Sequence, residues 1–112
     1  MEEMTVWKEY YDFWMKSKIP VHIIRYEDIK LNPVPTMTEL LKFILNVESL
    51  EGTKVEKYIS MACGSPAPEV YKIRPGGGQV NANKDKFNQK LLDEMYDYAS
   101  QLLLNFNYAE IF

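Results

Sequence analysis

A short apolar run in the first quarter of the chain most constrains what it can fold into. The run consists of Pro20, Val21, His22, Ile23, Ile24, Arg25 and Tyr26. Its apolar residues include consecutive positions, which is typical of a strand buried on both faces of a parallel sheet. Glu27 and Asp28 follow at once, at the strand end where open α/β sheets bind ligands. We therefore predict an α/β fold with one parallel-type strand near residues 20–26.

Helical patterns account for most of the remaining chain. An aromatic stripe at helical spacing predicts a helix that ends before Pro20. Further amphipathic helices are expected at residues 36–45, 52–63 and 84–105. Thr36 and Glu39 fit a capping box at the start of the first of these. Because a parallel strand is not stable alone and no second strand is evident, we expect residues 1–112 to be part of a single larger domain.

Charge and composition narrow the classes of function. The net charge of −3 and the pI of about 5.2 give no basic stripe of the kind that nucleic-acid binding requires. Cys63 is the only cysteine and His22 the only histidine, which excludes a disulfide framework and any metal site built from several such ligands. No apolar run approaches the length of a membrane span, and the acidic N-terminus lacks a signal-peptide pattern. We expect a cytoplasmic protein.

Two stretches carry residue types suited to a nucleotide. The ring of Tyr26 could stack on a flat base, although charged residues at such a corner usually face water, and the corner could simply be a strand end whose carboxylates pair with Arg25. Arg74, followed by Pro75 and Gly76, could hold a phosphate, because arginine offers a fork of donors and glycine lets the backbone approach an anion. The glycines could also be a flexible loop. They do not form a Walker A motif, since no Gly-Lys-Ser/Thr follows.

The order of these motifs along the chain resembles the C-terminal half of the sulfotransferase family. The stretches that carry the resemblance are the aromatic helix, Arg25-Tyr26-Glu27-Asp28, Asn32-Pro33, the leucine-rich helix, Arg74-Pro75-Gly76 and the final helix. It implies a P-loop-like fold that is mostly helical in this chain, and sulfuryl transfer from 3′-phosphoadenosine 5′-phosphosulfate (PAPS) to a hydroxyl or amine acceptor. Residues 1–112 would be the C-terminal part of that domain, with the N-terminal phosphate-loop half absent.

The resemblance also implies roles for individual residues. Tyr26 would lie beside the adenine of PAPS, with Glu27 and Asp28 as structural support. Arg74 would grip the 3′-phosphate, although Pro75 stands where the family has lysine. Cys63 would lie near the adenosine, or it is simply part of a helix end stopped by glycine.

No catalytic residue is expected within these residues, because the family's phosphate loop and acceptor base lie elsewhere in its chain. The alternative is a non-catalytic helical module that binds another protein through the aromatic face of its first helix. A degenerate nucleotide-binding remnant is a third possibility. At the end of the chain, Asn107 replaces a glycine of the family, as suits a left-handed backbone position.

Overall fold

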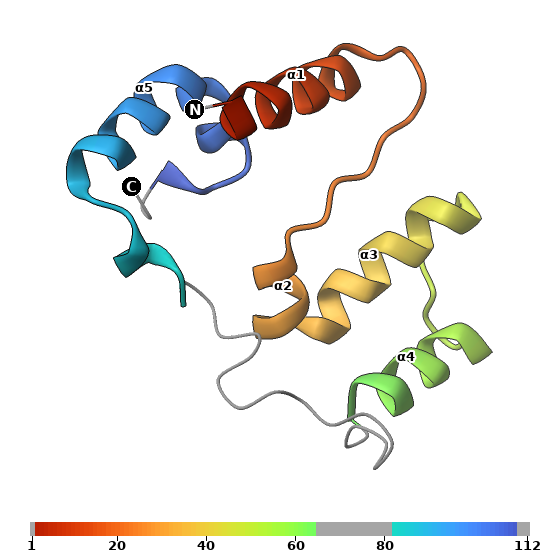
Figure 1. Ribbon diagram of the computed structural model, residues 1–112. Helices are drawn as coiled ribbons and strands as arrows, with labels where there is room; N and C mark the ends of the chain where they lie inside the picture. The colour runs from red at the N-terminus through yellow and green to blue at the C-terminus, as the bar shows by residue number, and fades with distance from the viewer. Residues whose placement is uncertain (1, 65–81, 110–112) are drawn as a thin grey trace. The chain divides into compact units, whose positions relative to one another are not determined.

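The computed structural model describes residues 2–64 and 82–109, and Figure 1 labels their helices. These are α1 (Glu2–Lys16), α2 (Tyr26–Leu31), α3 (Pro33–Leu45), α4 (Lys54–Gly64), the 3-10 helix η1 (Lys84–Lys86) and α5 (Gln89–Asn105). The chain divides into two compact units. Residues 1–21 and 81–112 form unit 1, and residues 22–80 form unit 2.

The predicted α/β fold with a parallel-type strand near residues 20–26 is wrong. The described part of the chain contains helices and no strand, and Tyr26 already belongs to α2. Arg25 does have an extended backbone, with φ −88° and ψ 143°. However, residues 20–24 form no backbone hydrogen bond with any described residue. A segment forms a β-strand only when a second strand pairs with it through backbone hydrogen bonds. The apolar pattern indicates that residues 20–26 favour an extended backbone, but it does not show whether a second strand is present.

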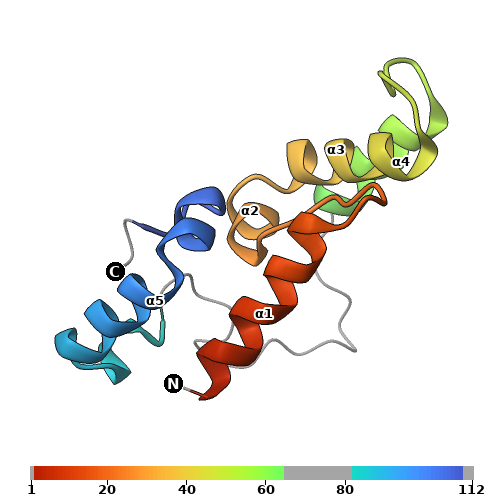
Figure 2. The ribbon, with the colours of Figure 1, turned by 90° about the horizontal axis from the view of Figure 1, so that it is seen from above.

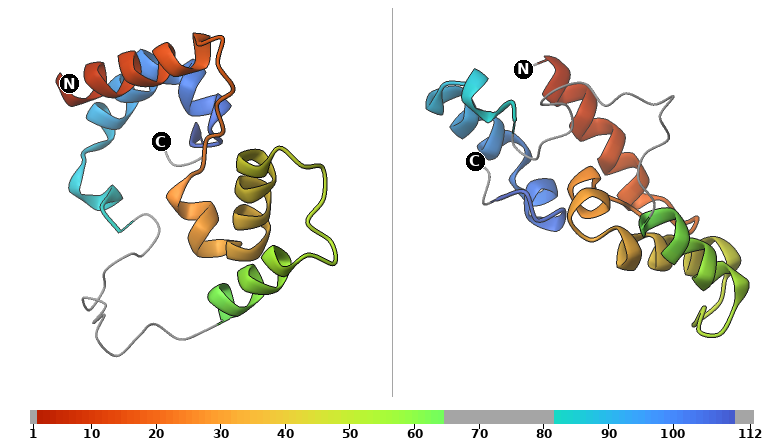
Figure 3. Two further views of the ribbon diagram at one scale, coloured as in Figure 1. Left: turned by 90° about the vertical axis from the view of Figure 1, so that its right-hand side faces the viewer. Right: turned by 90° about the horizontal axis from the view of Figure 1, so that it is seen from below.

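Unit 1 is built on the packing of α1 against α5 (Figure 2 and Figure 3). Its buried side chains come from α5 and the residue after it: Leu92, Ala99, Leu102, Leu103 and Phe106. The ring of Phe106 meets Tyr11 of α1 edge-on, with ring centres 5.2 Å apart, and Trp7 at 6.1 Å. These aromatic contacts join the two helices, so the predicted aromatic helix does form and packs against α5, although every residue of α1 stays at least partly exposed.

The ends of α5 differ partly from the prediction. Asn88 caps the helix by accepting a hydrogen bond from the backbone N–H of Leu91 (2.8 Å), so α5 begins later than the predicted residue 84. Ala99, fully buried, interrupts the helical backbone at φ −122° and ψ 17°. After the helix, Asn107 adopts a left-handed backbone with φ 56°, which confirms the conformation expected from the sequence.

Unit 2 is organised around α3, which packs against both α2 and α4. Leu50 and Ile59 are its buried residues among those described. The prediction that Thr36 caps a helix at that point is wrong, because α3 already begins at Pro33 after Asn32. Proline is well suited to the first turn of a helix, where its missing N–H costs nothing. The Thr36 hydroxyl instead donates to the carbonyl of Asp28 in α2 (3.0 Å), and so ties the two helices together.

Candidate nucleotide-binding site

The corner at the start of α2 is held by an ion pair between Arg25 and Asp28. The guanidinium Nε donates to one carboxylate oxygen at 2.8 Å, and Nη2 donates to the other. This two-point contact is the geometry that makes arginine–carboxylate pairs specific. The hydrogen bond from Arg25 lowers the pKa of Asp28 from its ordinary value, outweighing the opposite effect of partial burial. Asp28 therefore serves as a structural anchor of this corner.

We expect the Arg25–Asp28 pair to make unit 2 slightly less stable in acid. The folded pKa of Asp28 lies below its unfolded value of about 3.9, so the pair stabilises the fold above that pH. The stabilisation is lost as the pH falls through the lower, folded pKa. Replacing Asp28 with asparagine should cost about 0.5 kcal/mol near neutral pH, the size typical of an exposed ion pair.

Urea unfolding followed by circular dichroism at about pH 7 and about pH 2 measures this difference. The difference between wild type and Asp28→Asn should shrink toward zero at the lower pH. Glu48→Gln is the matched control, because Glu48 is exposed in the same unit and forms no ion pair with a described residue. An equal loss at both pH values would contradict the assignment.

Tyr26 is the first residue of α2 and presents its ring to solvent. The residue is 53% exposed, and its side chain forms no hydrogen bond or ring contact with any described residue. An exposed, uncommitted aromatic face is what stacking on a flat base requires.

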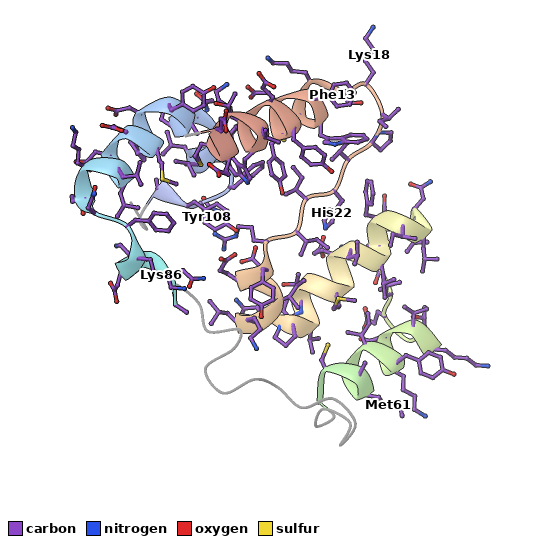
Figure 4. The ribbon with its side chains drawn as sticks, viewed as in Figure 1. Phe13, Lys18, His22, Met61, Lys86 and Tyr108 are labelled. Atoms are coloured by element: carbon purple, nitrogen blue, oxygen red, sulfur yellow. The ribbon has the colours of Figure 1, made fainter. Side chains whose placement is uncertain are left out.

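His22 anchors the extended segment that leads to this corner. Its ring stacks on Phe43 of α3, with ring centres 5.2 Å apart and planes inclined by 24° (Figure 4). The contact connects the segment before α2 to the central helix of unit 2. The only histidine of the chain is thus used for packing, and no described carboxylate pairs with it.

Only two of the residues predicted to bind the cofactor, Tyr26 and Cys63, are among the described residues, and no contact between them is observed. Cys63 is half-buried in the last turn of α4 and belongs to the same unit as Tyr26. No side-chain hydrogen bond connects Cys63 with Tyr26 among the described residues. Arg74, Pro75 and Gly76 lie outside the described residues. Tyr26 is therefore the predicted contact whose surroundings the structure defines most clearly.

Comparison with models of protein families, with curated proteins and with solved structures finds no match to this chain. Within the described ranges, no helix is both long and apolar enough to cross a membrane. In the same ranges, no three His, Cys, Asp or Glu side chains come together in a group that could hold a metal ion.

Proposed function

We propose that this chain provides the nucleotide side of a sulfotransferase that moves a sulfuryl group from PAPS to a hydroxyl or amine acceptor. The observation that carries the proposal is the environment of Tyr26. Its ring is more than half exposed, and it follows Arg25, which is paired with Asp28 at the start of α2. An exposed aromatic ring offers a face on which a flat base can stack.

The described residues fit the adenine end of the cofactor. Bound PAPS would supply the sulfuryl group together with the phosphate on which it leaves. Tyr26 would stack on the adenine and Cys63 would border the adenosine. Arg25 is engaged by Asp28, so Arg74 with the backbone of Pro75 and Gly76 would take the 3′-phosphate.

The remaining parts of the reaction would come from outside these residues. In this proposal a longer chain supplies the phosphate loop and the acceptor base, so residues 1–112 contribute binding and not proton transfer. The acceptor would be a small molecule rather than a nucleic acid, and the protein would act in the cytoplasm.

Calorimetric titration with 3′-phosphoadenosine 5′-phosphate tests this function in the full-length protein. Stacking on one base is worth about 1–3 kcal/mol, so Tyr26→Ala should weaken binding by about fivefold to 150-fold. Tyr26→Phe keeps the ring and should stay within about twofold of wild type. Tyr58→Ala is the control, since Tyr58 is also exposed but lies on α4.

Two outcomes would overturn the proposal. One is a wild-type protein that does not bind the nucleotide at all. The other is a Tyr26→Ala variant that binds as tightly as Tyr58→Ala. Loss of binding on Arg74→Ala would add support for the predicted phosphate contact.

A non-catalytic helical module that binds another protein is the second candidate function. The observation that favours it is the exposure of Val6, Tyr10 and Phe13 on α1, which are all more than half exposed. If this is the function, the titration above detects no nucleotide binding. The two candidates are therefore separated by one measurement.

A further inference from the structure

The short helix α2 carries a lysine on the same face as Tyr26. Lys30 stands four residues after Tyr26, and residues four apart are neighbours on the surface of a helix. Lys30 is exposed and forms no hydrogen bond or ion pair with a described residue. Ile29, three residues after Tyr26 and 39% exposed, adds apolar surface on this side of the helix. One face of α2 therefore offers an aromatic ring, an apolar side chain and an ammonium group.

The other described cations of unit 2 are either engaged or lie on a different helix. Arg25 forms the two-point contact with Asp28. Lys42 forms an ion pair across one turn of α3. The remaining described lysines of the unit lie on α4 (Figure 1), whereas Tyr26 begins α2. Lys30 is thus the uncommitted cation that shares a helix with the exposed ring.

We propose that Lys30 binds the 3′-phosphate of the nucleotide whose adenine stacks on Tyr26. This inference rests on the proposed function and adds a phosphate contact to it. Lysine is a compact charge on a long flexible stem, so its ammonium group can extend past the ring to the ribose side of a stacked base. In the proposed reaction the 5′-phosphate carries the sulfuryl group toward the acceptor. The 3′-phosphate is therefore the one that a cation beside the adenine can hold without obstructing transfer.

Lys30 was not among the binding residues predicted from the sequence. The predicted strand ended at Tyr26, and in that interpretation the two residues had no face in common. In the structure both belong to α2, and the spacing of four residues places them together. The signal that could have found this contact is that spacing, provided that the helix is taken to begin at Tyr26.

Calorimetric titration of the full-length protein with two nucleotides tests this contact. 3′-Phosphoadenosine 5′-phosphate carries the 3′-phosphate, and adenosine 5′-phosphate lacks it. Lys30→Met keeps most of the side-chain length and removes the charge. It should weaken binding of the first nucleotide by about fivefold or more and leave binding of the second within about twofold of wild type. Lys30→Arg keeps the charge and should bind the first nucleotide within about threefold of wild type.

The matched control is Lys54→Met on α4. Lys54 is also exposed, and it stands four residues from another exposed tyrosine, Tyr58. The two variants lose the same charge, so Lys54→Met should bind both nucleotides like wild type. The pair of nucleotides separates contact from folding, because damage to α2 itself would weaken the binding of both.

The outcomes distinguish this inference from the function on which it rests. A wild-type protein that binds neither nucleotide overturns both. If Tyr26→Ala weakens binding but Lys30→Met changes the affinity for the two nucleotides by the same factor, or not at all, the proposed function stands and the Lys30 contact is wrong. An equal loss of 3′-phosphoadenosine 5′-phosphate binding in Lys54→Met would also contradict the contact, since the effect would then come from net charge.

Discussion

Replacing Phe106 with alanine should unfold the helix pair of unit 1. Phe106 is only 8% exposed and is the residue through which the α5 end of the unit meets two rings of α1. Truncating a buried phenylalanine typically costs about 3–5 kcal/mol. A small domain has a total stability of about 5 kcal/mol or a little more, so this single change removes most of it.

Tryptophan fluorescence during urea unfolding reports on this unit selectively. The chain has two tryptophans, Trp7 and Trp14, and both lie on α1. Leu104→Ala is the control, because Leu104 stands two residues before Phe106 in the last turn of α5 but is 51% exposed, and its truncation should cost little. If Phe106→Ala and Leu104→Ala have the same midpoint, Phe106 does not hold the two helices together.

Helical segments could be predicted from the sequence because their signals are local. The aromatic stripe of α1 and the apolar stripe of α5 recur at the period of a helix, and both faces are indeed used in packing. The left-handed Asn107 was foreseeable for the same reason, since the preference resides in one side chain. In each case the residues that form the structure are also the residues that give the signal.

Whether residues 20–26 form a strand could not be predicted from local signals. Its stability depends on a partner strand, and an apolar run such as Ile23-Ile24 has the same composition whether or not that partner exists. Helix starts gave a subtler error. Thr36 and Thr53 are both followed by glutamate three residues later, but the capping bond forms at Thr53, whose hydroxyl accepts from the backbone N–H of Glu56 (3.3 Å). At Thr36 the preceding Pro33 had already started the helix.

The candidate site was predictable to the extent that it is local. Arg25 and Asp28 are three residues apart at the start of a helix. The sequence-based interpretation in which a carboxylate pairs with Arg25 is confirmed, because Asp28 forms this ion pair. The exposure of Tyr26 depends on which helices pack around it. That depends on α3, whose stripe predicts a buried face without saying which neighbour covers it.

Replacing Ile59 with alanine should unfold unit 2 and leave unit 1 intact. Ile59 is 5% exposed and, with Leu50, supplies the buried side chains among the described residues of that unit. Truncating a buried isoleucine to alanine costs about 2–5 kcal/mol. A unit with so small a core has little stability, so this loss is enough to unfold it. We therefore expect the helices α2, α3 and α4 to melt at a lower urea concentration.

Circular dichroism and tryptophan fluorescence, recorded on the same samples, separate the two units. In Ile59→Ala the helical signal should lose part of its amplitude early, while the fluorescence midpoint set by Trp7 and Trp14 stays where it is in wild type. Ile44→Ala is the matched control, since it removes the same atoms from a residue of unit 2 that is 61% exposed. Its cost should stay within about 0.5 kcal/mol. A fluorescence midpoint that shifts together with the helical signal would mean that the units unfold as one, because loss of the unit 2 core would then have removed stability from α1 and α5 as well.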